Sequence, residues 1–196
     1  MTKREREQLL ELATRRKTSR IFLKTRINLN DVYYCLKVAI QAPSGANKQP
    51  WRFLLIDEPA EKDKIRSACE QQEKRFHEKV KRNLKRWFTA KGIDYKKPFL
   101  SEAPFLLAVF SDQRMPYATE STWLSIGYLL LALEEKSISS LTYTPSYAQE
   151  VKKIFEAPKE YKLEAILPIG LSNDRKPKEK RRPLKHSLYC NSWGAH

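Results

Sequence analysis

The segment from Thr122 to Glu135 places the strongest constraint on how this chain can fold. Its apolar residues recur around the whole circumference of a helix rather than along one stripe. They are Trp123, Leu124, Ile126, Leu129, Leu130, Leu131 and Leu133. A helix that is apolar on all sides is buried on more than one side. The chain therefore needs a layered fold, and we expect a second subunit to complete the cover.

The rest of the chain alternates between helical and strand patterns. Apolar residues spaced three and four apart predict helices over residues 3–16, 29–40 with an Asn30 cap, 59–91 as one long basic arm ended by Gly92, and 149–155. Short apolar runs predict strands at "WRFLLI", "PFLLAVF", "SLTYT" and "LEAILPIG". This order predicts an α+β fold, a three-layer sandwich with a mixed sheet.

Length and composition set further limits. With 196 residues and 41% apolar content, the chain is large enough for one domain with a real core, over residues 1–196. It has no run of about 18 apolar residues, and its N-terminus is charged, so we expect a cytoplasmic protein without a membrane partner. Three widely spaced cysteines and three scattered histidines argue against a metal site.

The net charge of +15 predicts an anionic partner. A basic, non-enzymatic nucleic-acid-binding protein is one interpretation, with the segment 74–97 lying on phosphates. Against it, we expect Phe76, Trp87 and Phe88 to pack into the core, which would leave no platform for stacking bases. The other interpretation is a phosphorylated small molecule. The sequence lacks the G-x-G-x-x-G and P-loop motifs, so a phosphate would have to be held in another way.

Six motifs occur in an order and spacing that resemble one family. They are "RRKTSRIF", "APSGANKQPWRF", "EAPFLLAVF", "SSLTYTP", "ILPIG" and "KRRPL". Together they resemble the FMN-dependent nitroreductase superfamily, most closely its iodotyrosine deiodinase-like branch, over most of the chain. The resemblance implies a nitroreductase-like three-layer sandwich with a mixed, mostly antiparallel sheet flanked by helices. It also implies a lid insertion at about residues 70–100, a domain-swapped C-terminal tail at about residues 171–196, and a homodimer whose FMN sites are shared across the interface.

The resemblance also implies which residues hold FMN. The phosphate and the pyrimidine edge of the flavin would be held by Arg16, Lys17, Thr18, Arg20 and Arg181. The loop after the second helix would reach the flavin of the other subunit through Pro43, Ser44, Gly45 and Asn47. Small residues in that loop allow the backbone to approach a bound group closely.

The "TYTP" segment would lie beside the reactive part of the flavin. Thr144 aligns with the threonine whose hydroxyl meets flavin N5 in the deiodinase branch, a contact expected to favour one-electron steps. Tyr143 replaces a smaller residue of the closer relatives. It either contacts the flavin or fills a strand.

The lid suggests a substrate. In the deiodinase branch a glutamate, a tyrosine and a lysine bind the ammonium and carboxylate of a halogenated tyrosine. These positions align with Glu73, His77 and Lys97, with Lys96 one residue away as an alternative, and His77 stands where the branch has tyrosine. Without the resemblance, the simpler interpretation of Glu73 is a carboxylate on a solvated helix that balances Lys74, Arg75 and Lys81.

We therefore expect an FMN-dependent oxidoreductase of the nitroreductase family. NADH, NADPH or another donor would reduce the flavin, which would reduce a small aromatic acceptor such as a nitroaromatic, a quinone or a halophenol. Reductive dehalogenation of halotyrosines is the alternative within this family. No nucleic-acid partner is expected on this interpretation.

Overall fold

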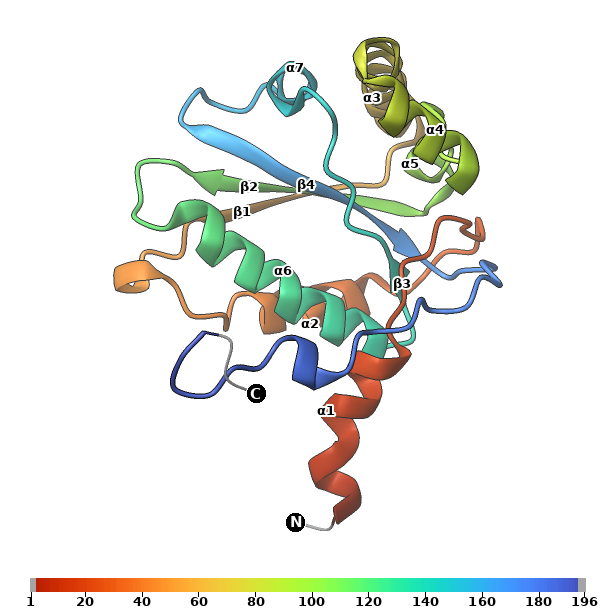
Figure 1. The fold of residues 1–196 in the computed structure, drawn as a ribbon. Coiled ribbons are helices and arrows are strands. Elements are labelled where there is room, and N and C mark those ends of the chain that lie inside the picture. Colours follow the sequence, from red (N-terminus) through yellow and green to blue (C-terminus); the bar gives the residue numbers. More distant parts are fainter. Residues whose placement is uncertain (1–2, 194–196) are drawn as a thin grey trace.

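One four-stranded sheet forms the centre of the computed structural model, which describes the backbone of residues 3–193 and the side chains of residues 8–90 and 92–193 (Figure 1). The strands are β1 (Trp51–Ile56), β2 (Phe105–Asp112), β3 (Ser139–Ser140) and β4 (Tyr161–Gly170), in the order β1-β2-β4-β3. All three pairings are antiparallel. An isolated parallel bridge joins Thr18 to Ser140. The predicted α+β fold with a mostly antiparallel sheet is confirmed.

Helices cover both faces of this sheet. In chain order they are α1 (Lys3–Arg15), α2 (Leu29–Ala39), α3 (Pro59–Lys79), α4 (Arg82–Lys91), α5 (Phe99–Glu102), α6 (Ala118–Glu135) and α7 (Ala148–Lys152). Short 3-10 turns are η1 (Gly45–Asn47), η2 (Lys153–Phe155) and η3 (Leu184–His186). α2 and α6 lie on one face, and α3, α5 and α7 lie on the other (Figure 1). The three predicted layers are therefore present.

The central strand β2 joins the two halves of the core. Its side chains alternate, so that Leu107 and Val109 pack with α2 and α6, whereas Leu106 and Ala108 pack with α3 and α5. Every residue of β2 is buried, as expected for a strand covered by helices on both faces.

Local boundaries differ from the sequence prediction at several places. Of the predicted strand "SLTYT", only Ser140 lies in a strand, β3, and Tyr143 forms an isolated bridge to Ile166. The cap of α2 is Asn28, whose side chain accepts the backbone N–H of Asn30, so the predicted Asn30 cap is wrong. The predicted long basic arm is two helices, because Val80 and Lys81 adopt extended backbone conformations. The break allows α4 to fold back so that the ring of Phe88 stacks on the ring of His77.

One side of α6 remains uncovered within a single chain. Trp123, Leu124 and Tyr128 are 36%, 48% and 40% exposed, whereas Ile126 and Leu129 are buried against the sheet. A Cβ added at Gly127, on the same exposed side, would meet no atom within 4 Å. The sheet and α2 thus cover one side of this apolar helix, and the other side is exposed in a single chain.

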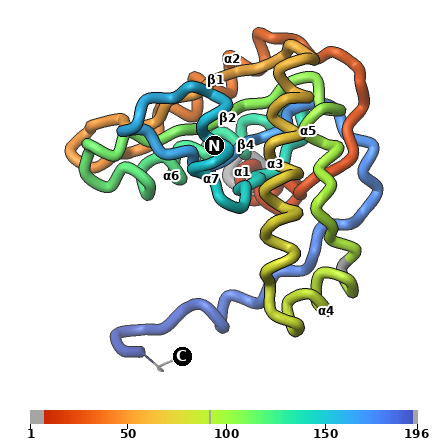
Figure 2. Tube along the Cα trace, turned by 90° about the horizontal axis from the view of Figure 1, so that it is seen from above, coloured from red at the N-terminus to blue at the C-terminus, as the bar shows by residue number. Residues whose placement is uncertain are grey.

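The chain after β4 leaves the body of the molecule. It pairs once more through a bridge between Phe22 and Ser172, and then extends outward (Figure 2). Three of its large apolar residues are exposed, with Leu184 at 72%, Leu188 at 50% and Trp193 at 89%. None of the helices within residues 3–193 is long and apolar enough to cross a membrane.

Candidate functional site

The segment after α1 and the first part of the C-terminal tail lie against each other at the edge of the sheet. The backbone N–H of Ser19 donates to the carbonyl of Ser140. Lys17 Nζ donates to the carbonyls of Asp174 at 2.5 Å and Lys176 at 2.8 Å. The backbone N–H of Arg20 donates to Asp174 Oδ2 at 2.9 Å. These bonds bring two basic segments together that are about 150 residues apart in the sequence.

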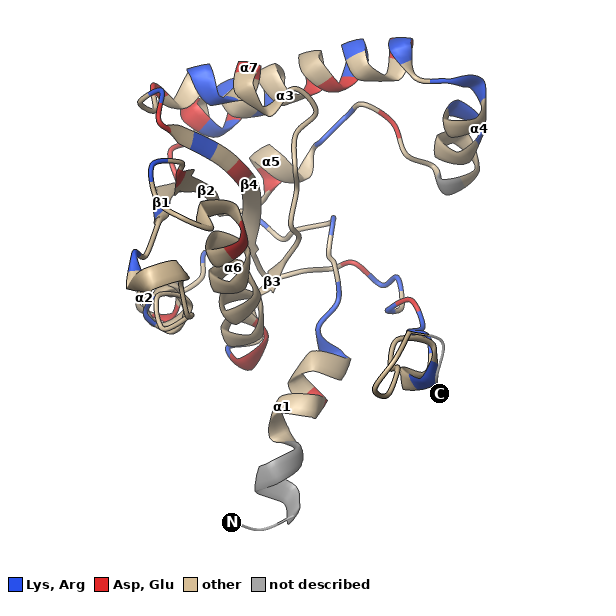
Figure 3. Ribbon diagram, turned by 60° about the vertical axis from the view of Figure 1, so that its left-hand side comes forward, with Lys and Arg blue, Asp and Glu red and all other residues tan. Residues whose placement is uncertain are grey.

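Like charges crowd together where these two segments meet. Burial lowers the pKa of Arg16, and the positive charge of Arg181 lowers it further. Burial likewise lowers the pKa of Lys178, which is also repelled by Arg181 and Arg16. Lysines and arginines gather in this region of the ribbon (Figure 3). We call Arg16, Lys17, Lys178 and Arg181 the cationic cluster. Such a cluster favours an anion with more than one negative charge.

Two further observations at this cluster bear on the fit of a phosphate. The hydroxyl of Ser19 is buried and has no hydrogen-bond partner among the described residues, as expected of a group whose partner is a ligand. Lys178 Nζ donates to the carbonyls of Ala13 and Thr14 and holds the tail against the end of α1. Sequence reasoning missed Lys178, although it lies three residues before Arg181 in the same basic run. The donor set fits a phosphate dianion.

A second group of candidate residues lies between α3 and the segment that follows β3. Glu73 is only 6% exposed, and its Oε1 accepts hydrogen bonds from the hydroxyl of Tyr143 and the backbone N–H of Ser146, both at 2.9 Å. Glu73 Oε2 lies 3.9 Å from Lys97 Nζ. Because Glu73 is buried, the interpretation of this residue as a solvated surface carboxylate is wrong.

The pKa values of this group reflect its burial. Burial lowers the pKa of Lys97, against the attraction of Glu73. Burial raises the pKa of Tyr143, and the negative charge of Glu73 and its hydrogen bond raise the pKa further, so the phenol stays protonated and can donate. Burial also raises the pKa of Cys69 to about 12, so this thiol is no nucleophile at neutral pH.

The structure separates the two lysines that the sequence left as alternatives. Lys97 is buried beside Glu73, and its backbone N–H donates to Glu70 Oε1. Lys96 is exposed. His77 does not join Glu73 in any described hydrogen bond, because its ring stacks on Phe88 with 4.6 Å between the centroids. Of the three predicted substrate residues, Glu73 and Lys97 are therefore brought together, and His77 lies farther along α3.

The "TYTP" segment runs past this group. Tyr143 pairs with Ile166 of β4 through two backbone hydrogen bonds, and its ring packs against Phe99. Thr144, the next residue, is exposed. Its side chain is thus accessible at the predicted flavin position.

The loop of residues 42–49 lies at a different place, beside the N-terminus of α6. The backbone N–H of Gly45 donates to Ser121 Oγ at 3.2 Å, and the hydroxyl of Ser44 accepts the backbone N–H of Gln49 at 3.0 Å. The side-chain and backbone oxygens of Asn47 both lie within hydrogen-bond distance of Gln49 Nε2. Pro43 is exposed at the start of the loop.

The predicted cofactor residues therefore fall at opposite ends of α6 within one chain. Gly45 is bound at Ser121, whereas Arg15, next to the cationic cluster, forms an ion pair with Glu134 at 2.6 Å. Ser121 and Glu134 are 13 residues apart in α6, a distance of about 20 Å at a rise of about 1.5 Å per residue. A single chain does not bring these two sets of residues around one ligand.

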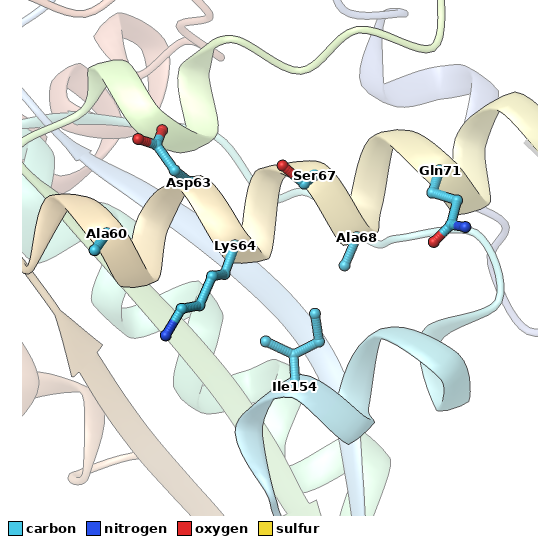
Figure 4. Close-up of a pocket in the computed structure, with 7 residues that line it drawn as sticks. All are labelled: Ala60, Asp63, Lys64, Ser67, Ala68, Gln71 and Ile154. Atoms are coloured by element: carbon cyan, nitrogen blue, oxygen red, sulfur yellow. The ribbon is translucent and has the colours of Figure 1, made fainter.

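A shallow hollow on the outer surface of α3 is separate from both groups (Figure 4). Its lining residues are Ala60, Asp63, Lys64, Ser67, Ala68, Gln71 and Ile154. The first six occupy the face of α3 that does not carry Glu73, and Ile154 belongs to η2. None of the predicted site residues lines it.

The aromatic residues of α3 and α4 do not pack as the sequence analysis expected, and this bears on nucleic-acid binding. Trp87 is 50% exposed, so the expectation that it packs into the core is wrong. Phe76 and Phe88 are partly buried and pack with His77 instead of with the sheet. The reason is that α4 lies beyond the sheet, as Figures 1 and 2 show, and has no layer beneath it. The sequence argument against nucleic-acid binding assumed that all three aromatic rings are buried in the core. Because Trp87 is exposed, that argument does not hold.

Comparison with known proteins identifies the class to which this fold and site belong. Residues 13–171 match the nitroreductase family, so the chain belongs to that family and is an oxidoreductase. Among its relatives, the iodotyrosine deiodinase of Thermotoga neapolitana is 51% identical over 91% of this chain and 96% of the relative. The iodotyrosine deiodinase of Haliscomenobacter hydrossis is 33% identical over 79% of this chain and 75% of the relative. A crystal structure of oxidised iodotyrosine deiodinase bound to FMN and 3-iodo-L-tyrosine superposes with a TM-score of 0.86, with 50% identity over 90% of this chain and 96% of that one.

Proposed function

We propose that this protein is an FMN-dependent reductive deiodinase of iodotyrosine. Of the acceptors considered from the sequence, a halotyrosine is now favoured over a nitroaromatic or a quinone. The observation that carries the proposal is the buried pair of Glu73 and Lys97, whose nearest charged atoms are 3.9 Å apart. A carboxylate and a cation side by side complement the ammonium and the carboxylate of an amino acid. The similarity to iodotyrosine deiodinases supports the same conclusion.

The residues of the cationic cluster would hold the FMN phosphate. Arg16, Lys17 and Arg181 supply the charge, and the unpartnered hydroxyl of Ser19 supplies a further hydrogen bond. Bound FMN would deliver two electrons from a reduced donor, which with a proton replace the carbon–iodine bond by a carbon–hydrogen bond and release iodide. Thr144 would present its hydroxyl to the flavin, while Glu73 and Lys97 orient the substrate. NADH or NADPH as the donor remains a prediction.

We infer that two chains form a homodimer with shared FMN sites. The separation of about 20 Å between Ser121 and Glu134 along α6 supports this inference, since residues expected on one flavin lie at both ends of that helix. The exposed apolar side of α6 and the exposed Leu184 and Trp193 of the tail provide the surface that a partner would cover. In such a dimer the tail of residues 171–196 would wrap the partner, and the segment of residues 70–100 would form the lid.

Titration of the oxidised, FMN-loaded protein tests the substrate. We expect iodotyrosine to bind at least about tenfold more tightly than 2-iodophenol, because only the amino acid carries the charges that Glu73 and Lys97 recognise. Glu73→Gln should remove this preference, whereas Glu78→Gln, an exposed position on the same helix, should keep it. Iodide release from iodotyrosine after reduction with dithionite measures the reaction itself. Equal binding of both phenols, together with normal reduction of nitroaromatics, would support a general nitroreductase instead.

A further inference from the structure

Glu73 has its two carboxylate oxygens in different environments. Oε1 accepts both the hydroxyl of Tyr143 and the backbone N–H of Ser146 at 2.9 Å. Oε2 has no described hydrogen bond and faces Lys97 Nζ at 3.9 Å, which is longer than a hydrogen bond. One oxygen is therefore occupied by the protein, and the other is available.

Tyr143 is well suited to hold this carboxylate in place. Its backbone N–H and C=O both pair with Ile166 of the central sheet, at 3.1 Å and 2.8 Å. Its ring is 7% exposed and packs edge-on against Phe99, with 5.6 Å between the centroids. The hydroxyl is thus fixed by the sheet and not by the lid that carries Glu73. A side chain that is locked by packing can orient a functional group more accurately than a mobile one.

Lys97 is also held by groups other than Glu73. Its Nζ donates to the carbonyl of Asp94 at 2.5 Å, and its backbone N–H donates to Glu70 Oε1 at 2.7 Å. The lysine therefore does not close onto Glu73, and both charges remain available to a ligand placed beside them.

We propose that Tyr143 is a positioning residue for recognition of the amino-acid group of the substrate: with the backbone N–H of Ser146, its hydroxyl anchors Glu73 Oε1 so that Oε2 points to the substrate ammonium beside Lys97. This inference rests on the proposed deiodinase function. It assigns to Tyr143 a role on the substrate side, beyond the contact with the flavin or the strand packing expected from the sequence. It also links the lid to the segment that carries Thr144, since Tyr143 and Thr144 are adjacent.

The test compares the ratio of the dissociation constants for 2-iodophenol and iodotyrosine, measured on the FMN-loaded protein. Tyr143→Phe keeps the ring and removes only the hydroxyl. It should lower this ratio about tenfold, the effect of losing one hydrogen bond to a charged group. Tyr147→Phe is the matched control, because Tyr147 is 41% exposed and lies close by, and it should leave the ratio unchanged. A ratio is used because general damage to the flavin site affects both ligands.

A double-mutant cycle separates positioning from packing. In the Glu73→Gln background, Tyr143→Phe should cause little further change in the ratio, because the group that it positions is already lost. Ser146→Pro removes the second donor to the same oxygen without altering the tyrosine ring, and provides an independent variant should Tyr143→Phe fold poorly. Like Tyr143→Phe, Ser146→Pro should lower the ratio of the two dissociation constants.

Two results would overturn the inference in distinguishable ways. If Glu73→Gln abolishes the preference for iodotyrosine but Tyr143→Phe and Ser146→Pro retain it, the positioning role is wrong and the proposed function stands. If Glu73→Gln itself retains the preference, the proposed function fails and the role of Tyr143 fails with it.

Discussion

The backbone N–H of Gly45 lies 3.2 Å from Ser121 Oγ, so the loop after α2 is fastened to the first turn of α6. The approach is so close that a side chain at position 45 would force Tyr117 to shift. A Cβ there would lie 2.7 Å from Tyr117 Cδ2 and 3.1 Å from the carbonyl oxygen of Pro116. The glycine is required by close packing within one chain, whatever else the loop contacts.

Gly45→Ala should therefore displace the loop. Overpacking of this kind costs about 1–3 kcal/mol, and we expect a lower urea midpoint together with weaker FMN retention. Ala46→Gly is the control, because Ala46 has a φ of 48° that glycine adopts more easily. An alanine at position 45 that preserves both stability and FMN content would contradict the tight contact.

Arg181→Ala should weaken FMN binding. The positive charge of Arg181 lowers the pKa of Arg16 and of Lys178, so the three cations lie in one electrostatic neighbourhood. We expect the dissociation constant of FMN to rise about ten- to a hundredfold, the range for one hydrogen bond to a charged group. Fluorescence titration of the apoprotein with FMN measures it. Arg182→Ala, at an exposed neighbouring position, should change the constant much less; equal effects would indicate a diffuse basic surface.

Leu124→Arg should prevent dimer formation. Leu124 is 48% exposed on the apolar side of α6, where a buried charge would be costly if a partner covers it. Sedimentation at low micromolar concentration should show a dimer for the unaltered protein and a monomer without FMN for the variant. Leu10→Arg, at a 68% exposed position in α1, should remain dimeric. A folded monomer that retains FMN would refute the shared site.

Because of Glu164 on β4, we expect the free energy of unfolding to fall as the pH becomes acidic. Its carboxylate accepts hydrogen bonds from Ser111 and Thr119 at 2.6 and 2.7 Å, and from Trp123 and Lys162 at 3.1 Å. Burial would raise the pKa of Glu164, but these hydrogen bonds outweigh it and lower the pKa. The folded pKa is therefore below the unfolded value of about 4.3, so this contribution is complete above that value and is lost as the pH falls through the folded pKa.

Glu164→Gln removes this charge while keeping the shape of the side chain. We expect a loss of about 1–3 kcal/mol in the free energy of unfolding at pH 7, and a weaker decline of stability between about pH 5 and pH 3. Urea denaturation across this pH range measures both. Glu61→Gln, which changes an exposed carboxylate paired with Lys64, should have little effect. Parallel pH profiles for the unaltered protein and Glu164→Gln would exclude the proposed linkage.

Several features of this protein are determined by the sequence itself. The strand Trp51–Ile56 has the bounds that its apolar run predicts, and the all-round apolar pattern of α6 predicts both its burial on the sheet and its exposed side. The six motifs indicate the family over nearly the whole chain. These features follow from local patterns, because the periodicity of apolar residues reflects which faces of an element are covered.

Other features were decided only by the tertiary structure. The break at Val80–Lys81 contains no glycine or proline that would predict it, and its result, the stacking of Phe88 on His77, joins residues of two separate helices. The burial of Glu73 could not be read from a helix rich in charges, since it is bound by Tyr143, 70 residues away in the sequence. The choice of Lys97 over Lys96 follows from the same packing. These hydrogen bonds and this burial depend on tertiary contacts between segments that are distant in the sequence. A local sequence pattern does not show which distant segments will be in contact.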